Sequence, residues 1–217
     1  MLTRRWFRGC GTGYTTNMLG AQHPGAKVIG VDLSAVPDSG LKQPSNVEFV
    51  QGDIRDLIES SPDFQPASFD YIFQRFLIYG ITDWPGHIEF VAKLLKPGGW
   101  MEFHEPDMQL TSRDGERLAD TMEWYQKFKE DIAVTGLEPE LGTKLPGLVR
   151  ASPSLENVHS KEYGLSPVPS DDKPELRALS SQLPHLFNMI ARKVSGARRS
   201  QEELDGTYLK GARLVTV

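Results

Sequence analysis

Four short runs of β-branched and aromatic side chains recur through the first half of the chain, each bounded by turn-forming or charged residues. Runs of this length and composition predict strands. The first run is rich in β-branched residues, which is typical of a strand buried on both faces. The predicted strands cover residues 27–32, 46–50, 69–73 and 100–103.

A helix is predicted between the last two of these strands. Asp83 is a favoured N-cap residue, Pro85 suits the first turn, and Lys96-Pro97-Gly98-Gly99 ends the helix. Between Asp32 and the second predicted strand there is little helical periodicity, so a loop replaces the usual crossover helix. Strands that alternate with helices predict an α/β fold with a parallel sheet and right-handed crossovers. The apolar face of the predicted helix comprises Ile88, Val91, Ala92 and Leu95.

The second half of the chain has a different pattern, which begins near Pro106. It predicts a helical cap over a nucleotide-binding core, so that residues 1–107 form the core and residues 108–217 form the cap and the rest of the same domain. Within the cap we expect an amphipathic helix over 114–132, a loop with one short helix over 136–156, a strand over 158–165 and a helix over 173–194 that breaks at Pro184.

The composition narrows the class of protein. Of the 217 residues, 39% are hydrophobic and 24% are charged, as in an ordinary globular protein. The formal net charge of −5 argues against general nucleic-acid binding. One cysteine and the lack of a long apolar run predict an intracellular protein, cytoplasmic or nuclear, without a membrane span.

A glycine loop carries the first chemical signal. Gly9, Gly11 and Gly13 precede by about 20 residues an acid, Asp32, that ends a predicted strand. Such a loop lets the backbone approach a ligand, and the acid can accept hydrogen bonds from ribose hydroxyls. Because Tyr14 stands where a dinucleotide site has its third glycine, the dinucleotide fingerprint fails. The remaining alternatives are a site for another nucleoside cofactor and a chance pair of turn glycines.

A second acid follows the next strand. Asp53 falls on the same carboxyl edge of the predicted sheet, where its carboxylate can accept from an exocyclic amine and Ile54 can pack on an adenine ring. The alternative is a helix N-cap, because Asp53 precedes a short helical pattern. The two roles are compatible, so both stay open.

Five blocks, taken in order, resemble the class I S-adenosylmethionine-dependent methyltransferases. More narrowly, the chain resembles the fungal methyltransferase-domain proteins of secondary metabolism, a group that includes a global regulator. The resemblance implies a Rossmann-like fold, with a mostly parallel twisted sheet flanked by helices, and S-adenosylmethionine as cofactor. The blocks are residues 9–13, 28–34, 46–53, 68–72 and 94–102.

The resemblance also implies roles for single residues. Gly9, Gly11 and Gly13 would line the methionine and ribose portions of the cofactor, and Asp32 would bind the ribose hydroxyls. The adenine would lie between Leu33 on one side and Asp53 with Ile54 on the other. Gln74 and Arg75 would close over the methionyl part and face the acceptor, although Arg75 also suits a plain surface position.

The chain departs from the family before the glycine loop. Phe7 stands where the family has an acid that meets the methionyl ammonium group, and Arg4, Arg5 and Arg8 would be costly to bury in a central strand. The helical segment that precedes this strand in the family is missing. At the other end, residues 201–211 resemble the final helix and 213–217 are a brief apolar tail. Both ends therefore look clipped, and we expect weak or no cofactor binding.

His104 is the candidate catalytic base, because it follows the last predicted strand at the edge where an acceptor would arrive. The alternative is a structural histidine at a strand end. No spacing typical of a metal site occurs. We expect methyl transfer to a small-molecule acceptor, a secondary metabolite. The alternatives are a non-catalytic regulatory protein that acts through protein partners and, less favoured, an NAD-dependent oxidoreductase.

Overall fold

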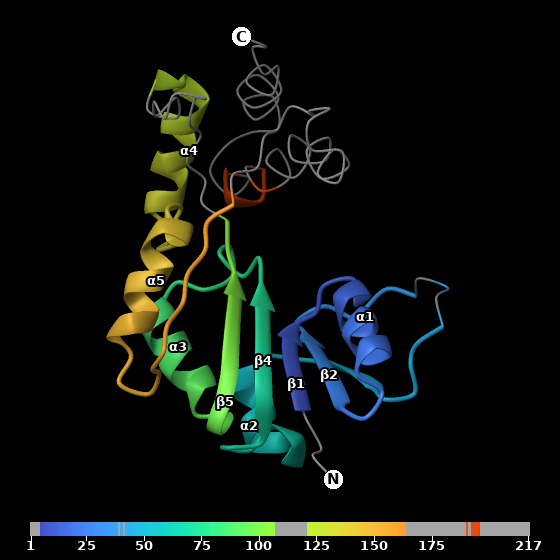
Figure 1. Ribbon diagram of the computed structural model, residues 1–217. Helices are drawn as coiled ribbons and strands as arrows, with labels where there is room; N and C mark the ends of the chain where they lie inside the picture. The colour runs from blue at the N-terminus through green and yellow to red at the C-terminus, as the bar shows by residue number, and fades with distance from the viewer. Residues whose placement is uncertain are drawn as a thin grey trace. The chain divides into compact units, whose positions relative to one another are not determined.

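The five strands form one parallel sheet in the order β3-β2-β1-β4-β5. Figure 1 labels β2, β1, β4 and β5, which lie side by side in that order. The computed structural model of the chain describes residues 5–38, 40, 42–106, 121–163, 190 and 192–195. Each neighbouring pair of strands is parallel. This order, in which the chain returns to the other side of β1 after the third strand, is that of the first five strands of a doubly wound α/β fold. The strands are β1 (Arg5–Gly9), β2 (Lys27–Asp32), β3 (Val47–Gln51), β4 (Phe69–Arg75) and β5 (Leu95–His104).

Helices connect most of the strands. The crossover between β1 and β2 is a helix, and the one between β4 and β5 contains a helix whose N-cap, Asp83, accepts a hydrogen bond from the Gly86 N–H over 2.9 Å. The described residues between β2 and β3 contain no helix, as the sequence predicts. The helices are α1 (Tyr14–Gln22), α2 (Ile54–Ser60), the 3-10 helix η1 (Pro62–Phe64), α3 (Trp84–Ala92), α4 (Glu123–Ala133) and α5 (Leu141–Ala151).

The chain divides into two compact units. The first contains residues 1–77, 83–106 and 147–158, and the second contains 78–82, 107–146 and 159–217. In the first unit, one apolar cluster unites strand residues such as Ile29 and Ile72 with Val91 of α3. A smaller cluster of Ala26, Val28 and Val47 packs with Leu19 of α1. In the second unit, the apolar core consists of Tyr125, Phe128, Ile132 and Val194.

The strand predictions for 27–32, 46–50 and 69–73 are confirmed to within two residues. The predicted strand over 100–103 is longer, because β5 begins at Leu95 and pairs Leu95 with Phe69 before a register shift. For the same reason the helix ends at Ala92 rather than Leu95. The residues before Gly9 form a paired central strand despite their arginines, with Phe7 beside Ile29 of β2 and Ile72 of β4.

Fewer of the predictions for the second half of the chain are confirmed. Of the helix over 114–132, the described part is helical from Glu123, and residues 107–120 lie outside the described residues. The short helix within 136–156 is α5, eleven residues long. The predicted strand over 158–165 is wrong for 158–163, because residues 159–163 are exposed and form no ladder with another strand. Of the helix over 173–194, only Ile190 and 192–194 are described, and these are helical. The predictions for 201–211 and 213–217 lie outside the described residues.

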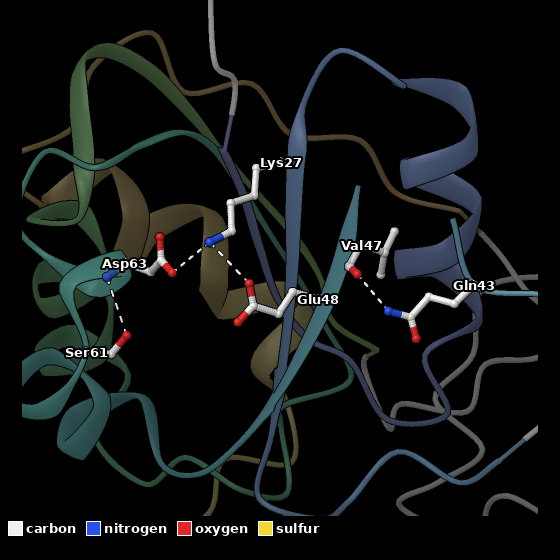
Figure 2. A network of polar contacts seen from close by, with 6 residues as sticks. All are labelled: Lys27, Gln43, Val47, Glu48, Ser61 and Asp63. Atoms are coloured by element: carbon white, nitrogen blue, oxygen red, sulfur yellow. Dashed lines mark hydrogen bonds and ion pairs between the residues drawn. The ribbon is translucent and has the colours of Figure 1, made fainter. Parts of the chain in front are cut away.

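Polar contacts hold the edge of the sheet where the strands begin. The Lys27 ammonium lies between Asp63, at 2.7 Å, and Glu48, at 3.1 Å (Figure 2). Burial alone would lower the pKa of Lys27, but the two carboxylates raise it above its ordinary value. At the opposite side of the sheet, Lys96 of β5 contacts both carboxylate oxygens of Asp70 of β4, at 3.0 and 2.9 Å. These bridges tie the start of β2 to β3 and the start of β5 to β4.

No helix in the described part of the chain is long and apolar enough to cross a lipid bilayer.

Candidate cofactor and acceptor site

The glycine loop turns sharply between β1 and α1. Gly11 and Gly13 have φ angles of 49° and 75°, which favour glycine strongly. A Cβ at Gly13 would lie 2.8 Å from Phe49 and 2.9 Å from Val36, so no larger residue fits there. At Gly11 a Cβ would meet nothing within 4 Å, which leaves the backbone open to an approaching ligand. The loop is therefore compact on its inner side and accessible at Gly11.

Asp32, at the end of β2, organises this loop. Its Oδ2 accepts a hydrogen bond from the Gly11 N–H over 2.8 Å, and its Oδ1 accepts one from the Ser34 N–H over 3.0 Å. Each carboxylate oxygen can accept a further hydrogen bond, because each has two lone pairs. The side chain is half-buried. Asp32 can therefore hold the loop and still accept from a vicinal diol such as that of a ribose.

The residues predicted to surround an adenine lie beside β2 and β3. Leu33 is 70% exposed, so its side chain offers an uncovered apolar surface. Asp53 is the N-cap of α2, since its Oδ1 accepts from the Arg55 N–H over 2.9 Å. Its Oδ2 has no hydrogen-bond partner among the described residues, so the cap leaves one oxygen for a ligand. Ile54 is half-buried against the core, which leaves only part of its side chain for a ring.

Gln74 and Arg75 end β4 and face opposite sides of the sheet, as successive strand residues do. Gln74 is 1% exposed, and its Oε1 lies 3.1 Å from His87 Nε2 of α3. Arg75 is exposed and has no hydrogen bond or ion pair among the described residues. Its guanidinium lies 5.4 Å from the ring centroid of Phe76. Of these two predicted site residues, Gln74 therefore points into the protein interior and Arg75 is exposed to solvent.

The turn after β4 is strained and reaches the glycine loop. Phe76 has a φ of 57°, a conformation that a bulky side chain rarely adopts, and its ring is 46% exposed. The Phe76 N–H donates to the His104 carbonyl and the Leu77 N–H donates to Glu105 Oε1, which together hold the turn. The Leu77 side chain lies 2.9 Å from the position of a Cβ at Gly9. Strain of this kind clusters at functional sites.

His104 ends β5 directly beside Arg75 in the register of the sheet. Its Nε2 lies 2.6 Å from Glu102 Oε1, and the other oxygen of Glu102 accepts a hydrogen bond from the Tyr71 hydroxyl. Burial and then the bond to Glu102 raise the pKa of Tyr71, so the phenol remains a donor. The His104 ring also packs edge-on against Phe73, with centroids 4.8 Å apart. Because a carboxylate only accepts, Nε2 carries the proton and Nδ1 is the nitrogen left to accept one.

The glycine loop, Asp32, Gln74, Arg75 and His104 thus come to one edge of the sheet, as the sequence predicts. Sequence reasoning missed His87, although Trp84, His87, Ile88 and Val91 share the spacing of one helix face, which placed His87 on the buried side. It also missed Glu102 and Tyr71, which only the pairing of β4 with β5 brings together. In the described part of the chain, no three metal-ligating side chains gather.

An α/β sheet with an open glycine loop and an acid after its second strand defines a nucleoside-binding fold. The family comparison is more specific, because a model described as a methyltransferase domain matches residues 8–136, which is more than half of the chain. The chain belongs to the methyltransferase-domain family.

Several curated relatives bear on the group within the family. The chain is 26% identical over 180 residues to methyltransferase str3 of Strobilurus tenacellus, with 83% of this chain and 63% of the relative covered. It is 36% identical over 109 residues to methyltransferase pytC of Aspergillus terreus, covering 49% and 31% respectively. The secondary metabolism regulator laeA of Coprinopsis cinerea is 29% identical over 175 residues, covering 76% and 42%. The chain therefore spans less than two thirds of the length of each of these relatives.

The solved structures support the fold. The structure of Haemonchus contortus phosphoethanolamine N-methyltransferase 2, in complex with phosphomonomethylethanolamine and S-adenosylhomocysteine, matches with a TM-score of 0.58. It is 19% identical, and the match covers 97% of this chain and 44% of that chain. A match at this identity establishes the Rossmann-like architecture.

Proposed function

We propose that this chain binds S-adenosylmethionine and transfers its methyl group to a hydroxyl of a small-molecule acceptor. The observation that carries the proposal is the meeting of an open glycine loop, an acid with spare acceptor capacity and a histidine with one free nitrogen at one edge of the sheet. The family match and the relatives named as methyltransferases support the same activity.

The residues present fit the adenosyl part of this cofactor. The open space at Gly11 admits a ligand against the backbone, and Asp32 retains lone pairs for two hydroxyls. Leu33 offers an exposed apolar surface, and the free oxygen of Asp53 is an acceptor for an exocyclic amine. These groups would hold the cofactor at its sugar and base.

The chemistry requires little from the protein beyond alignment and a base. When bound, S-adenosylmethionine supplies a methyl group on a sulfonium sulfur, which the acceptor oxygen takes as the carbon–sulfur bond breaks and its electron pair stays on sulfur. Nδ1 of His104 would take the hydroxyl proton, while Glu102 holds the opposite nitrogen of the ring. Arg75 and Phe76, both exposed beside His104, would contact the acceptor.

Calorimetric titration of the whole chain with S-adenosylmethionine and S-adenosylhomocysteine, with NAD as control, tests the proposal. We expect saturable binding of both adenosyl compounds and none of NAD. The affinity should be weak, because Phe7 stands where the family has an acid that meets the methionyl ammonium group. Binding of NAD alone would instead support the oxidoreductase alternative, and binding of neither class would refute a cofactor role for this site.

A second candidate function is regulation through protein partners without catalysis. Two observations favour it: Phe7 replaces the expected acid, and relatives from Coprinopsis cinerea and Monascus pilosus are named as secondary metabolism regulators. The two candidate functions predict different effects of a substitution at His104. In the organism that carries this gene, His104→Gln would abolish methyl transfer if the chain is catalytic. The same substitution would leave a purely regulatory role unchanged.

A further inference from the structure

A buried polar pair joins the end of β4 to the first turn of α3. Gln74 is 1% exposed and His87 is 5% exposed, and Gln74 Oε1 lies 3.1 Å from His87 Nε2. An amide oxygen only accepts, so His87 Nε2 carries the proton and donates it to Gln74. This bond decides which way the Gln74 amide is turned.

Aromatic packing fixes the His87 ring in turn. The ring meets Trp84 edge-on, with centroids 5.6 Å apart and planes at 82°. Trp84 meets Phe103 of β5 in the same manner, at 6.2 Å. One aromatic contact, from a tryptophan that itself packs on Phe103, and one hydrogen bond hold the imidazole in its orientation. The Gln74 oxygen is therefore held by a rigid donor.

The other end of the Gln74 amide is free. Its nitrogen has no hydrogen-bond partner among the described residues. A donor that is unsatisfied in the protein alone is satisfied when a ligand oxygen comes within reach.

The position of Gln74 in the sheet indicates which ligand its amide nitrogen would meet. Phe7 of β1 pairs with Ile72 of β4, and this register, continued by two residues, sets Gly9 beside Gln74. Gly9 opens the glycine loop, and Leu77, three residues beyond Gln74, lies against it. The free amide nitrogen thus belongs to the strand that adjoins the loop.

We propose that His87 is a positioning residue, which orients the Gln74 amide so that its nitrogen donates to the carboxylate of the methionyl part of a bound adenosyl cofactor. The inference rests on the proposed function and assigns a role to a residue outside the predicted site. Of the acceptors in that cofactor, the carboxylate is charged and therefore forms the strongest hydrogen bond with a buried amide donor.

The charge state of His87 agrees with this role. Burial, and then the Arg55 charge, lower the pKa of His87 to about 4, although Asp53 and Asp83 act in the opposite direction. At neutral pH the ring is therefore uncharged, with one donor nitrogen at Nε2. The charged groups that act on the ring come from both elements around it: Asp53 and Arg55 from α2, and Asp83 from the N-cap of α3.

The test compares two ligands by calorimetry on the full chain. S-adenosylhomocysteine has the amino acid portion, whereas 5′-methylthioadenosine has the same nucleoside and sulfur without it. His87→Phe keeps an aromatic ring but removes the donor, and His87→Gln restores a donor. For His87→Phe we expect S-adenosylhomocysteine to bind about tenfold more weakly, as the loss of one hydrogen bond to a charged group implies, and methylthioadenosine to bind as in the unaltered chain. His87→Gln should recover most of the loss.

Val91→Ala is the matched control, because Val91 is fully buried on the same helix as His87 and is not itself a residue of the proposed site. It should lower the melting temperature and leave both affinities unchanged. Equal weakening of both ligands by His87→Phe, or of neither, would overturn the positioning role while the proposed function stands. Failure of both ligands to bind the unaltered chain would overturn the proposed function and this inference with it. If His87→Phe does not fold, His87→Met makes the same comparison with a smaller, flexible side chain.

Discussion

The two edges of the sheet in the first unit are built from similar residues and use them differently. Where the strands begin, charges are paired: Lys27 with Asp63 and Glu48, and Lys96 with Asp70. Where the strands end, Arg75 has no ion pair among the described residues, and Asp32 is held only by backbone N–H groups.

The difference separates stability from binding. Groups that are satisfied within the chain stabilise it, whereas groups with unused donors, acceptors or charges are completed by a ligand. The strained backbone of Phe76 also belongs to the second edge. Substitutions at the starting edge should therefore change stability alone, and those at or beside the final edge should change ligand binding or the pH dependence of stability.

The largest expected effect is a pH dependence of stability that comes from His87. Its pKa is lowered to about 4 from the ordinary 6.5, so the unfolded chain takes up the proton first as the pH falls. The contribution is fully present above about pH 6.5 and is lost progressively down to about pH 4, by up to about 3 kcal/mol. Urea unfolding at several pH values measures it. His87→Gln should remove this part of the slope, and an unchanged slope in that variant would show that His87 does not cause it.

The next effect is on ligand affinity at Asp32. Replacement by Ala removes the acceptor for the ribose hydroxyls and the anchor of the Gly11 N–H. We expect S-adenosylhomocysteine to bind about a hundredfold more weakly, or about 2.7 kcal/mol, by calorimetry. Asp70→Ala is the matched control at the starting edge, where the loss of the Lys96 contact should leave affinity unaltered. Equal losses of affinity in the two variants would remove the distinction between the edges.

A smaller effect on stability is expected at Asn46, just before β3. Its amide nitrogen donates to the carbonyls of Gly20, His23 and Ala26, at 3.0, 3.1 and 2.8 Å. Asn46→Asp sets a carboxylate against three carbonyl oxygens and should lower the free energy of unfolding by about 2 kcal/mol. Chemical denaturation measures this loss.

Gln43→Glu provides the comparison for Asn46. Its amide nitrogen donates to the Val47 carbonyl alone, over 2.7 Å, so the loss should be smaller (Figure 2). Neither substitution should change the affinity for S-adenosylhomocysteine. A change in affinity with either one would mean that the starting edge of the sheet communicates with the site.

The smallest effect is expected at Lys27. The side chain is 37% exposed, so its ion pairs are partly screened by solvent. Lys27→Met should destabilise the chain by about 0.5–1 kcal/mol at low salt, and by less in about 1 M NaCl, as denaturation in the two buffers would measure. Because the pairing raises the pKa of Lys27, this contribution is complete below its ordinary value of 10.5 and is lost as the pH rises further. A loss that is independent of salt would indicate that the aliphatic stem, rather than the charge, matters.

Much of the first half could be predicted from the sequence, because its signals are local. Short runs rich in β-branched and aromatic residues predicted the strands, and Asp83 with Pro85 predicted the start of α3. Gly11 and Gly13 of the loop adopt positive φ angles, which favour glycine. In the second half the local signal misled: a strand is predicted over 158–165, yet among the described residues no neighbouring strand pairs with 158–163. A strand needs a partner, and sequence alone does not reveal one.

The sequence by itself determined the class of the fold, the edge of the sheet at which the candidate site lies, and the residue types at that edge. Only the tertiary structure decided how those residues are oriented. The inward turn of Gln74 toward His87 and the hydrogen bond from Tyr71 to Glu102, beside His104, both depend on strand register and helix packing. These contacts join residues from different elements, several of them far apart in the chain, so no local pattern specifies them.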